Sequence, residues 1–205
     1  NTIVDAIKHF KVQLKKHTFS SINLQKKQDI LNDENIKKIL LTMHRRENHQ
    51  HGIEQVCSAI NKLTSDLQVH VFFPIHPNPN VKKVVETIFK ANRKVTLLEP
   101  LTYFDLLKLM NKADLVLSDS GGLQEESPSF NKPILVLRDS TERPEIIDAG
   151  GGLLVGTNED KVYNVTREIL ENKKKYKEMS GIKNPFGDGN TSMRIIKKIK
   201  SINEK

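Results

Sequence analysis

The polar residues best suited to bind a ligand occur in a few short segments, and the first of these is His44-Arg-Arg-Glu-Asn-His-Gln-His51. Two arginines and three histidines directly after an apolar run make a poor solvated turn and a good polar site, with His44 as its first member. The histidines could suggest a metal ion. No cysteine, aspartate pair or helical i/i+4 histidine spacing accompanies them, so we predict no metal site.

A pair of glycines follows another apolar run, in the segment Ser118-Asp-Ser-Gly-Gly-Leu-Gln-Glu-Glu126. Gly121 and Gly122 allow the backbone to turn sharply and to approach a ligand. We expect Gln124 to open a helix, whose first N–H groups lack internal partners and form, with Ser120, an anion site. The same residues also fit an ordinary strand–turn–helix joint capped by Ser120.

An arginine lies at the exit of the next apolar run. Arg143 precedes Pro144, which suits the first position of a short helix. Its guanidinium could complete a clamp on a diphosphate. The alternative is that Arg138 and Arg143 form surface ion pairs with nearby acidic residues, namely Asp139, Glu142 and Glu145.

Two other side chains are candidates for nucleotide contacts. Glu126 could accept hydrogen bonds from ribose hydroxyls. His76 lies in the proline-rich turn Pro74-Ile-His-Pro-Asn-Pro-Asn80, which would hold it at the same end of a sheet as the other loops. A lone histidine is more often structural than functional, so its position is the argument for a role.

Short apolar runs alternate with helical patterns along the chain. We predict strands at 37–42, 69–75, 94–98, 114–118, 134–137 and 153–155. We predict helices at 2–14, 53–63, 81–91, 103–111, 123–130, 144–149, 159–171, 173–179 and 191–202, with a polar link at 20–35. Strands that are apolar on both faces and separated by helices indicate an α/β fold, a Rossmann-like doubly wound parallel sheet. If the strand order is 3-2-1-4-5-6, the loops after strands 1 and 4 flank the ligand-binding switch point.

Composition is that of an ordinary globular protein, with 205 residues, 37% of them hydrophobic. The net charge of +8 invites a nucleic-acid interpretation, but the lysines cluster on polar helix faces without interleaved aromatics. We therefore predict no nucleic-acid partner. The single cysteine, Cys57, excludes an internal disulfide and is expected to be a buried apolar residue.

No apolar run is long enough to cross a bilayer, and residues 1–20 lack the apolar core of a signal peptide. We therefore expect a cytoplasmic protein without a membrane partner. The first residue is Asn1 rather than Met, so the chain is expected to begin inside a longer product.

Taken together, the segments resemble the non-hydrolysing UDP-N-acetylglucosamine 2-epimerases. The likeness rests on four motifs in matching order, at 43–48, 74–80, 119–126 and 137–145, and on the flanking segments 1–6 and 184–189. It covers almost the whole chain but only the second half of the family's two-domain, GT-B-type fold. The resemblance implies a leading helix and interdomain link at 1–35, a UDP-binding domain at 36–190, and a C-terminal helix at 191–205 that packs toward a missing N-terminal domain.

The resemblance also implies roles for individual residues. Ser120, Gly121 and Gly122 would bind the diphosphate of UDP, with Arg143 as its cationic partner. The remaining expected contacts are Glu126 at the ribose, His76 near the uridine, His44 as the catalytic residue near the sugar, and Arg45 as a substrate or allosteric contact. Leu106 stands where family members often place a phenylalanine against the uracil, so stacking would be lost there.

The implied reaction inverts C2 of UDP-GlcNAc to give UDP-ManNAc, by elimination and re-addition of UDP and without a cofactor. The acid–base carboxylates would belong to the missing half, so the chain alone is expected to bind UDP weakly and not to epimerise it. The full enzyme is expected to be a homodimer in cell-surface polysaccharide biosynthesis. The alternatives are a GT-B glycosyltransferase domain, a hydrolysing epimerase and a catalytically incomplete binding fragment.

Overall fold

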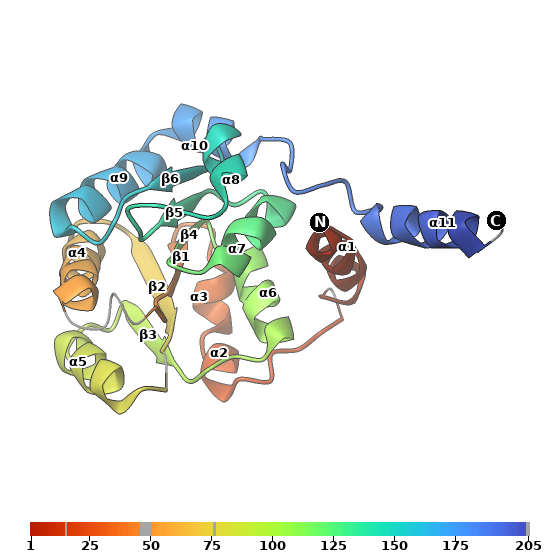
Figure 1. The fold of residues 1–205 in the computed structure, drawn as a ribbon. Coiled ribbons are helices and arrows are strands. Elements are labelled where there is room, and N and C mark those ends of the chain that lie inside the picture. The colour runs from red at the N-terminus through yellow and green to blue at the C-terminus, as the bar shows by residue number, and fades with distance from the viewer. Residues whose placement is uncertain (15, 46–50, 76, 204–205) are drawn as a thin grey trace.

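The computed structural model describes residues 1–14, 16–45, 51–75 and 77–203 (Figure 1). Its strands are β1 (Lys37–Thr42), β2 (Val69–Pro74), β3 (Val95–Leu98), β4 (Leu115–Ser118), β5 (Ile134–Val136) and β6 (Gly152–Leu154). Its longer helices are α1 (Thr2–Leu14), α4 (His51–Asp66), α5 (Pro79–Phe89), α6 (Tyr103–Lys112), α9 (Glu159–Glu171), α10 (Lys173–Ser180) and α11 (Thr191–Asn203). The shorter ones are α2 (Ile22–Gln25), α3 (Gln28–Asn32), α7 (Gly121–Glu126), the 3₁₀ helix η2 (Ser127–Phe130) and α8 (Pro144–Asp148).

The six strands form one parallel sheet in the order β3-β2-β1-β4-β5-β6. This confirms the predicted doubly wound, Rossmann-like sheet and its strand order. The chain reverses its direction of winding between β1 and β4, where Leu41 pairs with Leu117 and Thr42 with Ser118. At that point the two hydroxyl oxygens of Thr42 and Ser118 lie 2.7 Å apart. The carboxyl ends of β1 and β4 therefore deliver their loops to the same place.

Helices cover the sheet on both faces because successive strand residues point to opposite sides. Ile39 and Leu41 of β1 pack with α4, α5, α9 and α10, while Leu40 packs with the helices of the other face. That second layer contains α1, α2, α3, α6, α7 and α8, and its centre includes Leu40, Phe72 and Val116. Figure 1 shows α4 and α9 on one side of the sheet and α3, α6 and α7 on the other.

Two details of the predicted element order are wrong. The segment 20–35 is not only a polar link, because it contains α2 and α3, which bury Leu24 and Leu31. In addition, the helix after β4 begins at Gly121 and not at Gln124, since Ser120 is its N-cap with extended backbone angles. The two glycines thus lie in the first turn of the helix and not in a loop before it.

The amino-terminal helix belongs to the same packed layer as α6 and α7. Val4 and Ile7 of α1 are buried in one cluster with Phe130 and Phe186. By contrast, α11 extends past α1 away from the sheet (Figure 1), and it exposes a row of apolar side chains. These are Met193, Ile195, Ile196, Ile199 and Ile202. The division of the chain at residues 35 and 190 stays a prediction.

Cys57 lies in α4 and is completely buried. Burial raises the pKa of its thiol to about 12, helped by the nearby charge of Glu54. It is therefore a core residue, as predicted, and an unreactive thiol. Within the described ranges, no helix is long and apolar enough to span a membrane.

Candidate functional site

Asp119 joins the loops that leave β1 and β4. Its carboxylate is completely buried and accepts hydrogen bonds from the backbone nitrogens of His44 (3.1 Å to each oxygen) and Arg45 (3.0 Å). The Nδ1 atom of His44 lies 2.9 Å from the same carboxylate. Asp119 therefore fixes the backbone from which His44 and Arg45 project. The sequence contains one signal for this role, an aspartate directly after a strand, but that signal alone does not indicate which backbone groups Asp119 holds.

Arg45 points along the loop after β4 toward the loop after β5. Its Nε atom donates to the carbonyl oxygen of Asp119 (3.2 Å), and its Nη2 atom lies 3.6 Å from the Glu142 carboxylate. Glu142 also receives two hydrogen bonds from Arg138, at 2.5 and 2.9 Å. These bonds, chiefly, lower the pKa of Glu142 to about 2. The alternative that we considered for Arg138, a surface ion pair, is therefore the observed arrangement.

The first turn of α7 lies directly behind Asp119. The hydroxyl oxygen of Ser120 accepts from the backbone nitrogen of Leu123 at 3.5 Å, and the Ser120 nitrogen donates to the Ser118 hydroxyl at 2.9 Å. The N–H groups of Gly121 and Gly122 have no intrahelical partner, because a helix leaves its first donors unpaired. A cap at Ser120 and a site for an anion at the two glycines are thus compatible.

Arg143 is held along the side of α7. Its Nε atom forms an ion pair with Oε1 of Glu125, and its Nη1 atom donates to the carbonyl oxygen of Glu142 at 3.0 Å. The partner is not one of the acidic residues proposed from the sequence, because the contact runs to a different element. Thr141 anchors the loop by a 2.5 Å hydrogen bond to buried Gln124 and by accepting from the Arg143 nitrogen at 3.0 Å.

Glu126 lies on the buried side of α7, where it is 7% exposed. Burial raises the pKa of its carboxyl to about 7, a hydrogen bond from Tyr103 opposes this shift, and the charge of Glu125 adds to it. The Tyr103 hydroxyl donates to Oε1 of Glu126 at 3.0 Å, and burial and that carboxylate raise the pKa of Tyr103. Tyr103 comes from α6, and no sequence pattern places that helix against Glu126.

The other predicted site residues are less defined. Leu106 lies one turn after Tyr103 on α6 and is partly buried against the second core layer. No described contact joins it to Ser120 or Arg143, so its role stays a prediction. His76 lies outside the described residues. Among those that are described, no group of three or more histidine, cysteine or acidic side chains is arranged to hold a metal ion.

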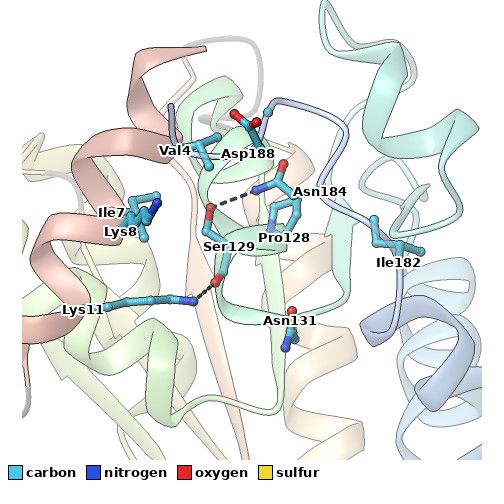
Figure 2. Close-up of a pocket in the computed structure, with 12 residues that line it drawn as sticks. Val4, Ile7, Lys8, Lys11, Pro128, Ser129, Asn131, Ile182, Asn184 and Asp188 are labelled. Carbon is cyan, nitrogen blue, oxygen red and sulfur yellow. Dashed lines mark hydrogen bonds between the residues drawn. The ribbon is translucent and has the colours of Figure 1, made fainter. Parts of the chain in front are cut away.

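A separate hollow of about 260 Å³ lies between α1, η2 and the segment 182–189 (Figure 2). Its lining includes Lys8, Lys11 and Asp188. None of its lining residues comes from the polar loops after β1, β4 and β5. The hollow and the candidate site are therefore different places.

Comparison with known proteins gives one consistent family. The family model described as UDP-N-acetylglucosamine 2-epimerase matches residues 1–200. The UDP-N-acetylglucosamine 2-epimerase of Yersinia pestis is 41% identical over 98% of this chain and 54% of its own length. That of Neisseria meningitidis serogroup A is 40% identical over 96% of this chain and 52% of its own length. The chain thus spans about half the length of the curated relatives that it matches.

Solved structures agree. The S. aureus MnaA–UDP co-structure matches with a TM-score of 0.87 and 37% identity, over 100% of this chain and 53% of that one. The Neisseria meningitidis UDP-GlcNAc 2-epimerase bound to UDP-GlcNAc gives a TM-score of 0.87 and 38% identity, over 98% of this chain and 54% of that one. A glycosyltransferase from Rickettsia africae, at 17% identity and a TM-score of 0.61, shares the fold alone.

These matches cover about half of each solved chain, as one half of a GT-B-type fold should. The predicted resemblance and fold class are therefore confirmed. The chain belongs to the UDP-N-acetylglucosamine 2-epimerase family.

Proposed function

We propose that this chain is the UDP-binding half of a non-hydrolysing UDP-N-acetylglucosamine 2-epimerase. The whole enzyme would interconvert UDP-GlcNAc and UDP-ManNAc by eliminating UDP and adding it back to the other face of the sugar. The observation that carries the proposal is the match, over 98 to 100% of this chain, to structures solved with UDP or UDP-GlcNAc.

Gly121 supports a diphosphate site at the start of α7. A side-chain carbon built at this residue would meet nothing within 4 Å, and no positive φ demands a glycine there. Neither packing nor backbone conformation explains the residue, whereas close approach of a ligand does. The free N–H groups of the first turn would then face the phosphates, and the helix dipole would favour their charge.

Arg143 supplies the matching cation. Its Nε and Nη1 atoms are engaged by Glu125 and Glu142, and its Nη2 group has no hydrogen-bond partner within the described ranges. One end of the guanidinium is thus fixed and the other remains available for an anion. As UDP leaves the sugar, negative charge grows on the diphosphate, and donors already in place would stabilise it. Retaining UDP for re-addition is what separates epimerisation from hydrolysis.

The remaining assignments follow the family resemblance. Glu126 would accept from the ribose hydroxyls, and His44 would act beside the sugar with Arg45 as a neighbouring contact. Asp119 supports the placement of both by fixing their backbone. His76 near the uridine and Leu106 at the uracil complete the proposed nucleotide contacts. No cofactor is required by this reaction.

The half that would carry the acid–base carboxylates is proposed to precede this chain. The exposed apolar row of α11 supports a contact with it, because five large apolar side chains on one 13-residue helix are costly to leave in water. Assembly of the full enzyme as a cytoplasmic homodimer completes the proposal. Because the acid–base carboxylates would lie in the other half, the 205-residue chain should bind UDP but not epimerise UDP-GlcNAc.

Gly121→Ala tests the site, because this variant should fold normally and bind UDP more weakly. The added methyl group has room in the protein but would enter the space of the phosphates, so we expect UDP affinity to fall at least about tenfold, equivalent to ~1.4 kcal/mol. Titration calorimetry with UDP measures the affinity, and urea unfolding verifies that stability is not lowered.

Ser120→Ala and Arg143→Ala should weaken UDP binding as well, while Arg167→Ala on α9 serves as a matched control for removal of an ion-paired arginine. Unchanged affinity in all three site variants would exclude the proposed diphosphate site.

A further inference from the structure

Glu125 is shared between the candidate site and the amino terminus of the chain. Its Oε1 atom pairs with Nε of Arg143, and its Oε2 atom accepts a 2.7 Å hydrogen bond from the side-chain amide of Asn1. The Glu125 side chain is 16% exposed, whereas Asn1 lies at the surface. The Glu125 carboxylate therefore links Arg143, the cation of the candidate site, to Asn1, which directly precedes α1.

Asn1 is itself fastened to the segment that leads into α11. Its backbone nitrogen donates to the carbonyl oxygen of Phe186 at 2.9 Å. Four residues further on, Asp5 accepts from the backbone nitrogens of Thr191 (3.1 Å) and Ser192 (2.7 Å), which are the first donors of α11. We call residues 1–5 and 186–192 the terminal pair. Figure 1 shows the amino terminus beside the start of α11.

The element that follows α7 is held by the same two ends of the chain. In Figure 2, Lys11 of α1 and Asn184 reach Ser129 of η2 from opposite sides. The Lys11 ammonium donates to the Ser129 carbonyl oxygen, and the Asn184 amide donates to its hydroxyl at 2.9 Å. Lys11 and Asn184 lie next to the terminal pair along the chain, and η2 continues directly from α7. A shift of the terminal pair would therefore reach Glu125 both through Asn1 and through η2 and α7.

We propose that Glu125 is a positioning residue that couples the terminal pair to Arg143. Movement of the terminal pair would thereby change how tightly the diphosphate is bound. The effect on diphosphate binding rests on the proposed function, whereas the contacts of Glu125 with Asn1 and Arg143 do not. If the terminal pair connects to a second domain, as proposed, domain movement would pull on Asn1. The Arg143 guanidinium would then be oriented when Asn1 holds Glu125 and released when it does not.

Exchanging the amide and the carboxylate between the two positions tests this coupling. Asn1→Asp places two carboxylates against each other and should push Glu125 away. Glu125→Gln keeps one acceptor oxygen and replaces the other by an NH2 donor. Asn1 cannot turn its amide to match, because its Oδ1 atom already accepts from the Ile3 nitrogen at 3.1 Å. In the double variant the introduced amide can donate to the introduced carboxylate while its oxygen accepts from Arg143. The original pattern is thus restored with donor and acceptor reversed.

We expect each single variant to weaken UDP binding about fivefold, at the low end of measured couplings between sites, and the double variant to recover most of the affinity. Glu171→Gln is the matched control, because Glu171 accepts from an arginine Nε atom at 2.9 Å on α9, away from the terminal pair. A merely structural role for Glu125 would lower stability and would not produce recovery in the double variant.

Exchange of the Arg143 Nε proton with water, measured by NMR without UDP, is the second readout. It should accelerate in both single variants and slow again in the double variant. If proton exchange follows this pattern while Arg143→Ala leaves UDP affinity unchanged, the coupling holds and the proposed diphosphate site fails. If exchange at Arg143 is the same in all four proteins, the coupling is excluded.

Discussion

Asp119 and Glu126 are buried carboxylates at the two ends of one eight-residue stretch, yet their surroundings differ. Asp119 receives three hydrogen bonds from backbone nitrogens of the loop after β1, and His44 Nδ1 lies beside it. Glu126 receives one hydrogen bond, from the Tyr103 hydroxyl, among the residues that the structure describes. The carboxylate with fixed donors holds the site together, whereas the one with few donors has capacity left for a ligand. The difference supports the proposal that Asp119 is a structural acid and Glu126 a binding acid, without reference to any relative.

Removing Asp119 should have the largest effect on stability. Asp119→Ala leaves the backbone nitrogens of His44 and Arg45 without their acceptor, and we expect the free energy of unfolding to fall by about 3 kcal/mol. Asp119→Asn keeps one acceptor oxygen and should lose roughly half of that. Urea unfolding measures both. A loss below about 1 kcal/mol for the alanine variant would mean that Asp119 does not hold the loop.

Glu126→Gln should change how stability depends on pH. The pKa of Glu126 is about 7 in the folded protein against an ordinary value of 4.5, so between these two values the unfolded chain releases a proton that the folded chain keeps. Stability therefore falls as pH rises from 4.5 to 7, by up to about 3 kcal/mol, and the glutamine variant lacks this loss.

Urea unfolding of both proteins at several pH values between 4.5 and 8 isolates the contribution of Glu126, because every other titrating group is common to the two. The variant should become the more stable protein toward pH 8. If the free energy of unfolding of the two proteins depended on pH in the same way, the pKa of Glu126 would not be raised by folding. Glu126 would then be as well supplied with donors as Asp119.

Tyr103→Phe should have the smallest effect of the three. It removes the described donor to Glu126, and we expect a loss of about 1 kcal/mol at pH 8. The same substitution in the Glu126→Gln background should cost less, since a neutral acceptor forms a weaker hydrogen bond. Urea unfolding measures the loss in free energy of unfolding in both backgrounds. Equal losses would mean that the contribution of Tyr103 does not depend on the charge of Glu126.

The architecture could be predicted because its signals are local and repeated. Each strand is a short apolar run, and β1 shows why: alternate residues bury against different helical layers, so both faces must be apolar. The segment at α2 and α3 was missed because single buried residues, Leu24 and Leu31, give no helical periodicity in a polar sequence. The start of α7 was placed too late because adjacent glycines favour turns, whereas the Ser120 cap begins the helix before them.

The site was predictable as a set of loops but not as a set of contacts. Residues 44, 45, 120 and 143 carry unusual side chains after strands, and parallel topology brings such loops together. Which acid pairs with Arg143 depends on how the loop after β5 lies along α7, and no local pattern encodes that. The Tyr103–Glu126 contact likewise depends on the packing of α6 against α7 across the layer.

The burial of Cys57 has a practical consequence. The only thiol in the 205-residue sequence lies in α4 with its reactivity suppressed, so this 205-residue chain can serve as its own background for cysteine labelling. A spin label or fluorophore attached to a cysteine introduced on α11, and another on α9, would report the distance between the two helices. The coupling of the chain ends to the nucleotide could then be followed by spectroscopy in a protein that otherwise carries its own sequence.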